Sequence, residues 1–348
     1  MRAQILIRCD AGPALGSGHV MRCLSLARAL VERGAGVTFA STFQTLETVP
    51  GLVASGYQRI TLDRPLDTDE ITVPGRHWDA VVVDHYALDA RQETAFRRVA
   101  PVVLVIDDLA NRSHDCDLLC DQTIGRTVAD YAPLVPPAAT VLLGAEYALL
   151  RPAFARSRPA ALAARAMGRP VSRVLISLGM TDVGGITAWA TEAALASGLD
   201  AEFAVAVGAR AKSLPALKAL AEKDRRVVLH PDCEDMCALM VASDLAIGAG
   251  GMTSWERCCL GLPAIILVLA ENQTRNAQHL ARLGAAEFLP ERDPSALAAA
   301  VQRLAADTGA RVAMSRAAAT LTDGKGAQRL ADLLMKHVAA LRVSADER

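Results

Sequence analysis

The chain alternates short apolar runs with longer segments in which apolar residues recur at helical spacing. In the first half the apolar runs cover residues 5–9, 36–40, 80–84 and 102–106. In the second half they cover residues 171–179, 201–207, 227–230, 244–248 and 264–270. Buried parallel strands read as nearly continuous apolar runs, and the helices that connect them read as amphipathic segments. The pattern therefore predicts βαβ units and an α/β fold.

The alternation is interrupted once, which predicts two domains. A stretch rich in Ala, Arg and Pro separates the two series of runs. We expect an N-terminal Rossmann-like domain over residues 1–155, a linker over 156–170, a C-terminal Rossmann-like domain over 171–310, and closing helices with a tail over 311–348. Ligands of open parallel sheets bind beyond the carboxyl ends of the strands, so we expect the two Rossmann-like domains to face a ligand cleft.

Composition narrows the classes of function. Hydrophobic residues make up 52% of the chain and aromatic residues only 4%, which favours cores of Ala, Val, Leu and Ile. The formal net charge of −1 gives no basic footprint, so nucleic acid is not an expected partner. The N-terminus lacks a secretion-signal pattern, and the apolar runs are shorter than the ~20 residues of a membrane-spanning helix. We expect a cytoplasmic monomer without a membrane anchor.

The eight cysteines are expected to be reduced thiols. Most lie within predicted strands or helices, where a thiol acts as a small apolar side chain. The pairs Cys116/Cys120 and Cys233/Cys237 each have a histidine nearby, but their three-residue gaps lack the spacing of zinc knuckles. We expect neither a bound metal nor another cofactor.

The first candidate site is the glycine-rich loop that joins the run 5–9 to the next helix. Its candidate substrate-binding residues are Asp10, Gly16, Ser17, Gly18 and Arg22, and its candidate catalytic residue is His19. Glycines allow close approach to the backbone, and a helix start favours an anion or a polarised water. An imidazole there can accept a proton near neutral pH, or it can simply cap the helix. The loop lacks the dinucleotide fingerprint, which argues against NAD.

The second candidate site follows the run 244–248. Its residues are Gly250, Gly251, Thr253, Ser254 and Glu256. Backbone N–H groups of the glycine turn, together with a hydroxyl, can hold a diphosphate. Glu256 lies about one helical turn further on, where a carboxylate can accept both ribose hydroxyls. The alternative for Glu256 is a first-turn acid that the helix dipole stabilises.

Two further strand ends carry polar residues. Asn272 and Gln273 follow the run 264–270 and offer amides to sugar hydroxyl or acetamido groups. A capping turn would explain amides there equally well. Asp84, His85 and Tyr86 stand at the end of the run 80–84 and could hold the sugar or an attacking water, although a histidine or tyrosine at a strand end is more often structural.

Taken together, these segments resemble the UDP-sugar hydrolases of the pseudaminic-acid pathway. The resemblance spans nearly the whole chain and is carried by residues 16–23, 83–86, 106–108, 120–122, 147–152, 248–256 and 272–273. It implies two Rossmann-like domains of the GT-B fold, related to the enzyme that adds GlcNAc to lipid I. It also implies that water is the acceptor and that His19 is the catalytic base.

The resemblance further implies a reaction. The substrate would be UDP-2,4-diacetamido-2,4,6-trideoxy-β-L-altropyranose, cleaved by water at C1 to UDP and the free sugar. The product would serve modification of flagellin or surface polysaccharide with a nonulosonic acid. We also expect UDP to bind mainly to the second domain, with uracil near Asp235 and Met236 after the run 227–230. Because UDP leaves as a stabilised anion, one base can suffice and no metal is required.

The chain departs from the family pattern at two places, and two other functions stay open. Residues 179–185 read Gly-Met-Thr-Asp-Val-Gly-Gly where the family tends to have Gly-Gly-Ser-Asp-Pro, and Met252 replaces a small hydroxyl residue. Thr181 is still expected to contact the substrate. The first alternative is a GT-B glycosyltransferase in which His19 deprotonates a sugar or lipid hydroxyl. The second is a nucleotide-sugar-binding protein without catalysis.

Overall fold

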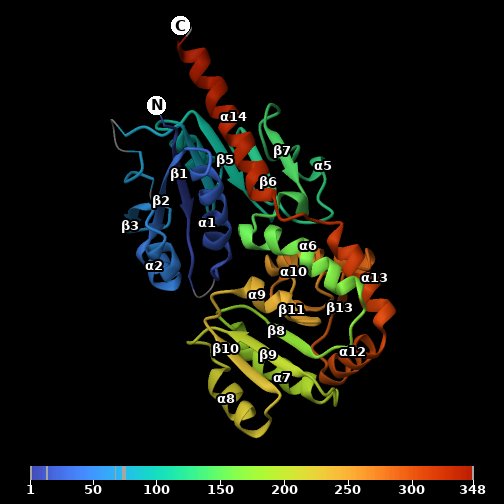
Figure 1. Cartoon of the computed structure of the whole chain (residues 1–348). Helices are drawn as coiled ribbons and strands as arrows, with labels where there is room; N and C mark the ends of the chain where they lie inside the picture. The colour runs from blue at the N-terminus through green and yellow to red at the C-terminus, as the bar shows by residue number, and fades with distance from the viewer. Residues whose placement is uncertain (1, 13–14, 67, 73–75, 347–348) are drawn as a thin grey trace. The chain divides into compact units, whose positions relative to one another are not determined.

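The computed structural model describes residues 2–12, 15–66, 68–72 and 76–346. The chain divides into two compact α/β units (Figure 1). The first unit extends to Arg151 and takes up the chain again from Lys325, and the second unit covers Pro152–Gly324. Both are built on parallel sheets, so the α/β expectation is confirmed.

The first unit contains a seven-stranded parallel sheet with the order β3-β2-β1-β4-β5-β6-β7. Its strands are β1 (Gln4–Cys9), β2 (Gly36–Thr42), β3 (Gln58–Leu62), β4 (Ala80–Asp84), β5 (Val102–Ile106), β6 (Leu118–Asp121) and β7 (Thr140–Leu143). Its helices are α1 (Gly18–Val31), α2 (Phe43–Thr48), α3 (Pro50–Ala54), α4 (Ala90–Phe96), α5 (Val128–Tyr131), η1 (Ala145–Tyr147) and α14 (Gly326–Asp346). The strand order reverses between β1 and β4, where ligands of such sheets bind.

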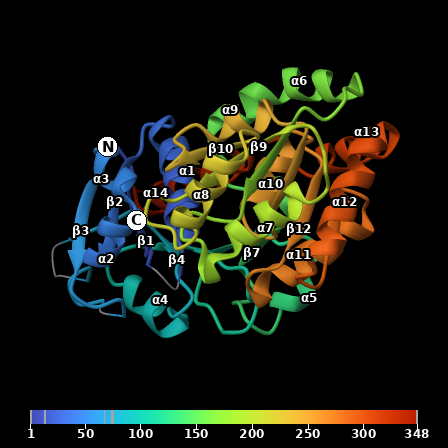
Figure 2. The same cartoon turned by 90° about the horizontal axis from the view of Figure 1, so that it is seen from below.

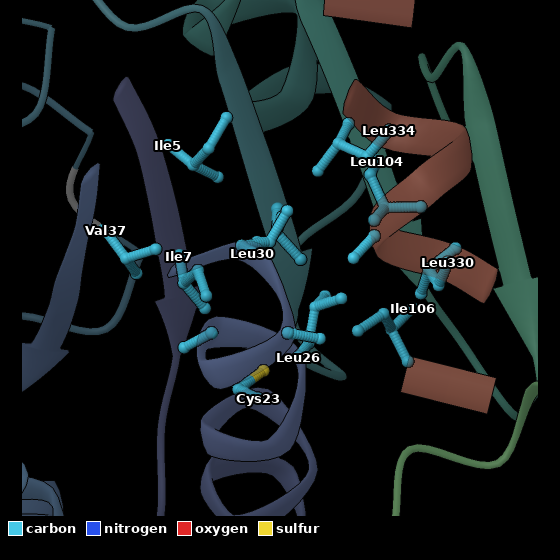
Figure 3. Packing of buried hydrophobic residues seen from close by; sticks show 14 of the residues in the cluster. Ile5, Ile7, Cys23, Leu26, Leu30, Val37, Leu104, Ile106, Leu330 and Leu334 are labelled. Atoms are coloured by element: carbon cyan, nitrogen blue, oxygen red, sulfur yellow. The ribbon is translucent and has the colours of Figure 1, made fainter. Parts of the chain in front are cut away.

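One face of this sheet packs against α1 and α14. Figure 3 shows the layer, whose labelled members include Ile5, Ile7, Leu26, Leu30, Leu104, Ile106, Leu330 and Leu334. All of these side chains are at most 1% exposed. Burying each one stabilises the fold by about 1.5–3 kcal/mol. Helix α14, near the C-terminus, therefore belongs to the same hydrophobic core as β1.

The second unit contains a six-stranded parallel sheet with the order β10-β9-β8-β11-β12-β13. Its strands are β8 (Arg173–Ser177), β9 (Glu202–Val207), β10 (Val227–Pro231), β11 (Leu245–Ala249), β12 (Ala264–Leu267) and β13 (Glu287–Leu289). Its helices are α6 (Pro152–Ala166), η2 (Val183–Gly185), α7 (Ile186–Leu195), α8 (Leu214–Lys223), α9 (Met236–Val241), α10 (Thr253–Cys259), η3 (Glu271–Gln273), α11 (Thr274–Arg282), α12 (Pro294–Ala306) and α13 (Thr308–Ala319). Helices α7 and α12 cover one face of the sheet (Figure 2).

The unit boundaries differ from the expected domain boundaries. Most of the expected linker, residues 156–170, lies in α6, which begins at Pro152 and belongs to the second unit. Arg158 in this helix donates to the carbonyls of Cys259 and Ala319, both at 2.6 Å. The expected closing segment is likewise divided, with α13 in the second unit and α14 in the first. Packing partners distant in sequence set these boundaries, and composition does not show them.

Four strands were not expected from the apolar pattern. They are β3, β6, β7 and β13, which contain only three to five residues each. Strands β3, β7 and β13 lie at sheet edges and are incompletely buried, so they need no continuous apolar run. None of the helices in the described ranges combines the length and hydropathy required to cross a bilayer.

Candidate functional site

The carboxylate of Asp84, the last residue of β4, is the centre of a buried charged cluster in the first unit. His19 Nδ1 lies 2.5 Å from Asp84 Oδ1. Arg22 donates two hydrogen bonds to the same carboxylate, from Nε to Oδ2 and from Nη2 to Oδ1, both at 2.6 Å. His19 and Arg22 lie one turn apart on α1, so the helix presents both to the end of the neighbouring strand.

The contacts of His19 fix which ring nitrogen carries the proton. A 2.5 Å separation between Nδ1 and a carboxylate oxygen requires a proton on Nδ1, which donates to Asp84. The 3.2 Å approach of Arg22 Nη2 to the same nitrogen is then a contact between two donors that share one acceptor oxygen. In neutral His19, Nε2 is therefore left as the proton acceptor. His19 turns to Asp84 and does not cap α1, whose N-cap residue is Ser17.

The charges of the cluster stabilise one another. Burial alone raises the pKa of Asp84, but Arg22 and His19 outweigh burial and hold the pKa well below its usual range. Burial lowers the pKa of Arg22, and the attraction of Asp84 and Asp108 reverses this and raises it. Asp84 is thus a carboxylate beside a permanently charged guanidinium, which keeps the His19 ring oriented.

Asp108 and Tyr86 extend the cluster. Asp108 Oδ2 accepts hydrogen bonds from Arg22 Nη1 (3.0 Å) and from the Tyr86 hydroxyl (3.3 Å). The Tyr86 ring packs edge-on against His19, with ring centroids 4.5 Å apart. Burial and the neighbouring Asp108 raise the pKa of Tyr86, so its hydroxyl keeps its proton. The structure thus brings together four residues singled out in the sequence, namely His19, Arg22, Asp84 and Tyr86.

Sequence reasoning included Asp84 among the strand-end residues that could hold the sugar or an attacking water, and it gave Asp108 no role beyond the resemblance. Each stands at the carboxyl end of a buried strand, Asp84 closing β4 and Asp108 two residues after β5. Position at a strand end is the signal that pointed to Asp84 and that could have found Asp108. It could not have shown that Asp84 pairs with a histidine 65 residues earlier in the chain.

Asp10 is held by protein partners on both carboxylate oxygens. Arg8 Nη2 donates to Oδ2 at 2.7 Å, while the Thr42 amide and Thr45 Oγ1 donate to Oδ1 at 2.8 and 2.9 Å. Burial raises the pKa of Asp10, but hydrogen bonds from His85 and Arg8 lower it below the usual range. In the structure Asp10 anchors the start of the glycine-rich loop to β2, and its predicted contact with substrate stays a prediction.

The glycine-rich loop leads directly into α1. Gly16 has a φ of +73°, and its amide donates to the Gly12 carbonyl at 2.7 Å. Ser17 makes no side-chain capping bond, and the first turn of α1, which begins at Gly18, contains no acidic residue. The opening amides of α1 therefore keep a positive electrostatic end next to His19. Contacts of Gly16, Ser17 and Gly18 with substrate stay predictions.

In the second unit, a glycine turn joins β11 to α10. Thr253 is the first residue of α10, and its hydroxyl accepts a hydrogen bond from Arg257 Nη1 (3.1 Å). Ser254 is buried and donates to the Ala249 carbonyl (3.2 Å), so its hydroxyl faces into the unit. Glu256 is half-buried in the same helix. The predicted strand, turn and helix all occur here, while the predicted ligand contacts stay predictions.

The two candidate loops of the second unit lie side by side. A Cβ on Gly250 would lie 3.0 Å from the Gln273 carbonyl oxygen and 3.1 Å from Gln273 Cβ. Asn276 Nδ2 reaches the Gly250 carbonyl at 3.5 Å. Gln273 Oε1 accepts a hydrogen bond from the Leu269 amide (3.1 Å), whereas Asn272 lies at the exposed surface. A Cβ built on Gly251 would have one neighbouring atom within 4 Å, Gln273 Nε2, at 3.7 Å.

The two remaining predicted residues occupy other strand ends of the second unit. Met236 is the first residue of α9 and is half-buried, and Asp235 caps this helix by accepting from the Ala238 amide at 2.9 Å. Thr181 is half-buried in the loop after β8, next to Asp182. The Asp182 side chain has a structural role, since it accepts hydrogen bonds from Thr187 at the start of α7.

Metal ligands are not assembled in the described part of the chain. No group of three or more His, Cys, Asp or Glu side chains is placed there to hold an ion. All eight cysteines are free thiols, and burial raises the pKa of several of them, including Cys258 and Cys259, each to about 12.

Comparison with known proteins identifies the fold. The model of the glycosyltransferase family 28 C-terminal domain matches residues 187–332. The crystal structure of Acinetobacter baumannii MurG superposes with a TM-score of 0.69 at 18% identity, covering 97% of this chain and 100% of that one. The two parallel-sheet units are therefore those of the GT-B fold.

Two relatives show how far the sequence similarity extends. The spore coat polysaccharide biosynthesis protein SpsG of Bacillus subtilis is 24% identical over 94% of this chain and 96% of its own length. A UDP-N-acetylglucosamine–N-acetylmuramyl-(pentapeptide) pyrophosphoryl-undecaprenol N-acetylglucosamine transferase of Xanthomonas axonopodis is 34% identical, but over only 31% of this chain and 27% of its own length. The chain therefore has the GT-B fold, and its residues 187–332 are similar to the C-terminal domain of glycosyltransferase family 28.

Proposed function

We propose that the chain cleaves the bond between C1 of a UDP-linked sugar and the diphosphate, and passes the glycosyl group to an oxygen nucleophile. The observation that carries this proposal is the His19–Asp84 pair. The 2.5 Å contact between His19 Nδ1 and Asp84 leaves Nε2 of His19 as the proton acceptor. The two hydrogen bonds from Arg22 keep Asp84 ionised. A histidine whose tautomer a buried carboxylate fixes is the arrangement that general-base catalysis requires.

The proposed reaction is a nucleophilic displacement of UDP at C1 of the sugar. His19 Nε2 takes the proton from the nucleophile, whose oxygen forms a new bond to C1. The bond from C1 to the phosphate oxygen breaks, and its electron pair leaves with UDP. The transition state has oxocarbenium character, as in other glycosyl cleavage. UDP departs as a stabilised anion, so the leaving group needs no proton and one base serves the reaction.

The second unit is proposed to hold the nucleotide. The family 28 match covers the segment that contains Gly250, Gly251 and Thr253, where we place the diphosphate. Glu256 would accept the ribose hydroxyls, and uracil would lie near Met236. Asn272, Gln273 and Thr181 would contact the sugar. The named transferase relatives support a UDP-sugar as the ligand class.

The comparisons favour a hydroxyl as the nucleophile. The relative from Xanthomonas is named as a transferase, and the matched domain model is that of a glycosyltransferase family. The chain would then transfer the sugar to a hydroxyl group of a second substrate, with His19 as the base for that hydroxyl.

Water is the second candidate nucleophile, and the surroundings of His19 favour it. Only 6% of the His19 side chain is exposed, and the Tyr86 ring packs against it. A base so enclosed is more accessible to water than to a bulky acceptor. The chain would then be a cytoplasmic, metal-independent hydrolase, and its motifs suggest UDP-2,4-diacetamido-2,4,6-trideoxy-β-L-altropyranose as the substrate.

In the deciding experiment, the protein is incubated with UDP-2,4-diacetamido-2,4,6-trideoxy-β-L-altropyranose without metal or acceptor. UDP release is measured, and NMR follows the fate of the sugar. His19→Ala is expected to lower turnover by about 10²–10⁴-fold. His114→Ala is the matched control, since His114 Nδ1 also contacts a buried carboxylate, that of Glu93, at 2.8 Å, but its side chain is fully enclosed.

Each outcome assigns a function. Free sugar released in a His19-dependent reaction identifies a hydrolase. Substrate that stays intact until an acceptor alcohol is added identifies a transferase. Tight UDP-sugar binding without turnover under either condition rejects the enzymatic proposal and leaves a nucleotide-sugar-binding protein.

A further inference from the structure

Arg257 is a buried positive charge directly behind the glycine turn of the second unit. The residue is 2% exposed. Its Nη2 donates to the Ala249 carbonyl (2.7 Å) and to Ser254 Oγ (3.0 Å), and its Nη1 donates to Thr253 Oγ1 (3.1 Å). All three acceptors are neutral and belong to the turn or to the start of α10. Among the described residues, no carboxylate forms an ion pair with Arg257.

The sheet makes room for this guanidinium. A Cβ on Gly248 would lie 2.2 Å from Arg257 Nη1, so only glycine fits at that position of β11. Burial lowers the pKa of Arg257 to about 10, and the attraction of Cys258 and Glu256 offsets burial only in part. A guanidinium still keeps its proton at neutral pH. The second unit therefore buries the positive charge of Arg257 in an environment where a charge without a counter-ion is energetically costly.

The half-buried Arg165 of the second unit is compensated differently. Arg165 donates to the carbonyls of Met240, Ser243 and Leu260 at 2.8–3.0 Å. These carbonyls lie at the carboxyl ends of α9 and α10, where helix dipoles are negative. Arg257 instead reaches back to the beginning of its own helix, where the dipole is positive. Its charge therefore adds to the local positive potential.

We propose that Arg257 is a positioning residue for the diphosphate of the substrate. It fixes the segment from Ala249 to Ser254 through its three hydrogen bonds, and it supplies a positive charge that the diphosphate balances on binding. A buried charge acts strongly across the short distance to the front of the turn, because little water screens it. This inference rests on the proposed function, since it concerns the same nucleotide.

The test compares binding of UDP and of uridine to the full-length protein by calorimetry at low ionic strength. Arg257→Met is expected to weaken UDP binding by about tenfold or more and to leave uridine binding within about twofold. Arg257→Lys, which keeps the charge but loses the fork of donors, should lie between the wild type and Arg257→Met. Arg165→Met is the matched control, because it also removes a guanidinium, here half-buried, whose pKa burial lowers to about 10. It should lower Tm without changing the ratio of the two affinities.

Several outcomes would overturn the inference. If Arg257→Met weakens binding of UDP and of uridine equally, Arg257 has only a structural role. The same conclusion follows if Arg165→Met changes the ratio of the UDP and uridine affinities as much as Arg257→Met does. If Arg257→Met does not fold, the same ratio measured on Arg257→Lys decides. A wild type that binds neither UDP nor inorganic pyrophosphate rejects the proposed function as well. A wild type that binds UDP with an affinity the Arg257 variants share rejects the positioning role alone.

Discussion

Arg22 and Arg257 are both buried arginines on the helix that follows a strand end, yet their surroundings are opposite. Arg22 contacts two carboxylates, Asp84 and Asp108, and its pKa is raised. Arg257 contacts a carbonyl and two hydroxyls, and its pKa is lowered to about 10. In the first unit carboxylates thus balance the charge of the arginine, whereas in the second unit neutral groups surround it.

This difference corresponds to two chemical tasks. A base needs a fixed tautomer and a carboxylate that stays ionised, and Arg22 secures both through Asp84. A site for an anion needs positive charge that no protein carboxylate already occupies, and Arg257 meets that condition. Under the proposed function, an arginine helps to hold a proton acceptor in one unit and attracts a negative ligand in the other.

The largest expected effect comes from removing the carboxylate that neutralises Arg22. Asp84→Asn should lower kcat by about 10³–10⁴-fold, because an amide no longer holds the proton on His19 Nδ1. Steady-state UDP release measures this. Glu93→Gln is the control, since it alters the other buried histidine–carboxylate pair, with His114. Similar losses of kcat in the two variants would show that buried pairing in general, and not the His19 base, supports turnover.

The next largest effect concerns the space that Arg257 occupies. Gly248→Ala places a Cβ 2.2 Å from Arg257 Nη1 and should destabilise the second unit by about 1–3 kcal/mol. Urea unfolding measures the change. Gly251→Ala is the control, because its Cβ would meet nothing closer than 3.7 Å, and it should stay within about 0.5 kcal/mol of wild type. An unchanged midpoint for Gly248→Ala would mean that the guanidinium is not held against β11.

The smallest expected effect is on acid stability. The folded-state pKa of Asp84 lies below its unfolded value of about 3.9, so its stabilising contribution is complete above that pH and is lost as pH falls through the folded value. Arg257 stays charged throughout and adds no such slope. Urea unfolding at pH 5, 4 and 3 should show a smaller loss for Asp84→Asn than for wild type. Identical slopes would contradict an ionised Asp84.

The apolar pattern predicted the central strands of both sheets well. The runs 80–84 and 102–106 coincide with β4 and β5. Edge strands such as β7 and β13 escaped the pattern because they are incompletely buried. The expected linker turned out to be largely α6, since an Ala- and Arg-rich segment suits a helix whose arginines cap other helices.

The sequence by itself determined the alternation of strands and helices, and it placed His19, Tyr86 and the glycine turn at Gly250 next to strand ends. These features depend on local periodicity and on backbone preferences of nearby residues. Tertiary structure alone decided that Asp84 holds His19, that α14 completes the first core, and that Arg257 has no carboxylate partner within the described part of the chain. Each of these depends on which distant segments pair and pack, and the periodicity of one segment carries no record of its partner.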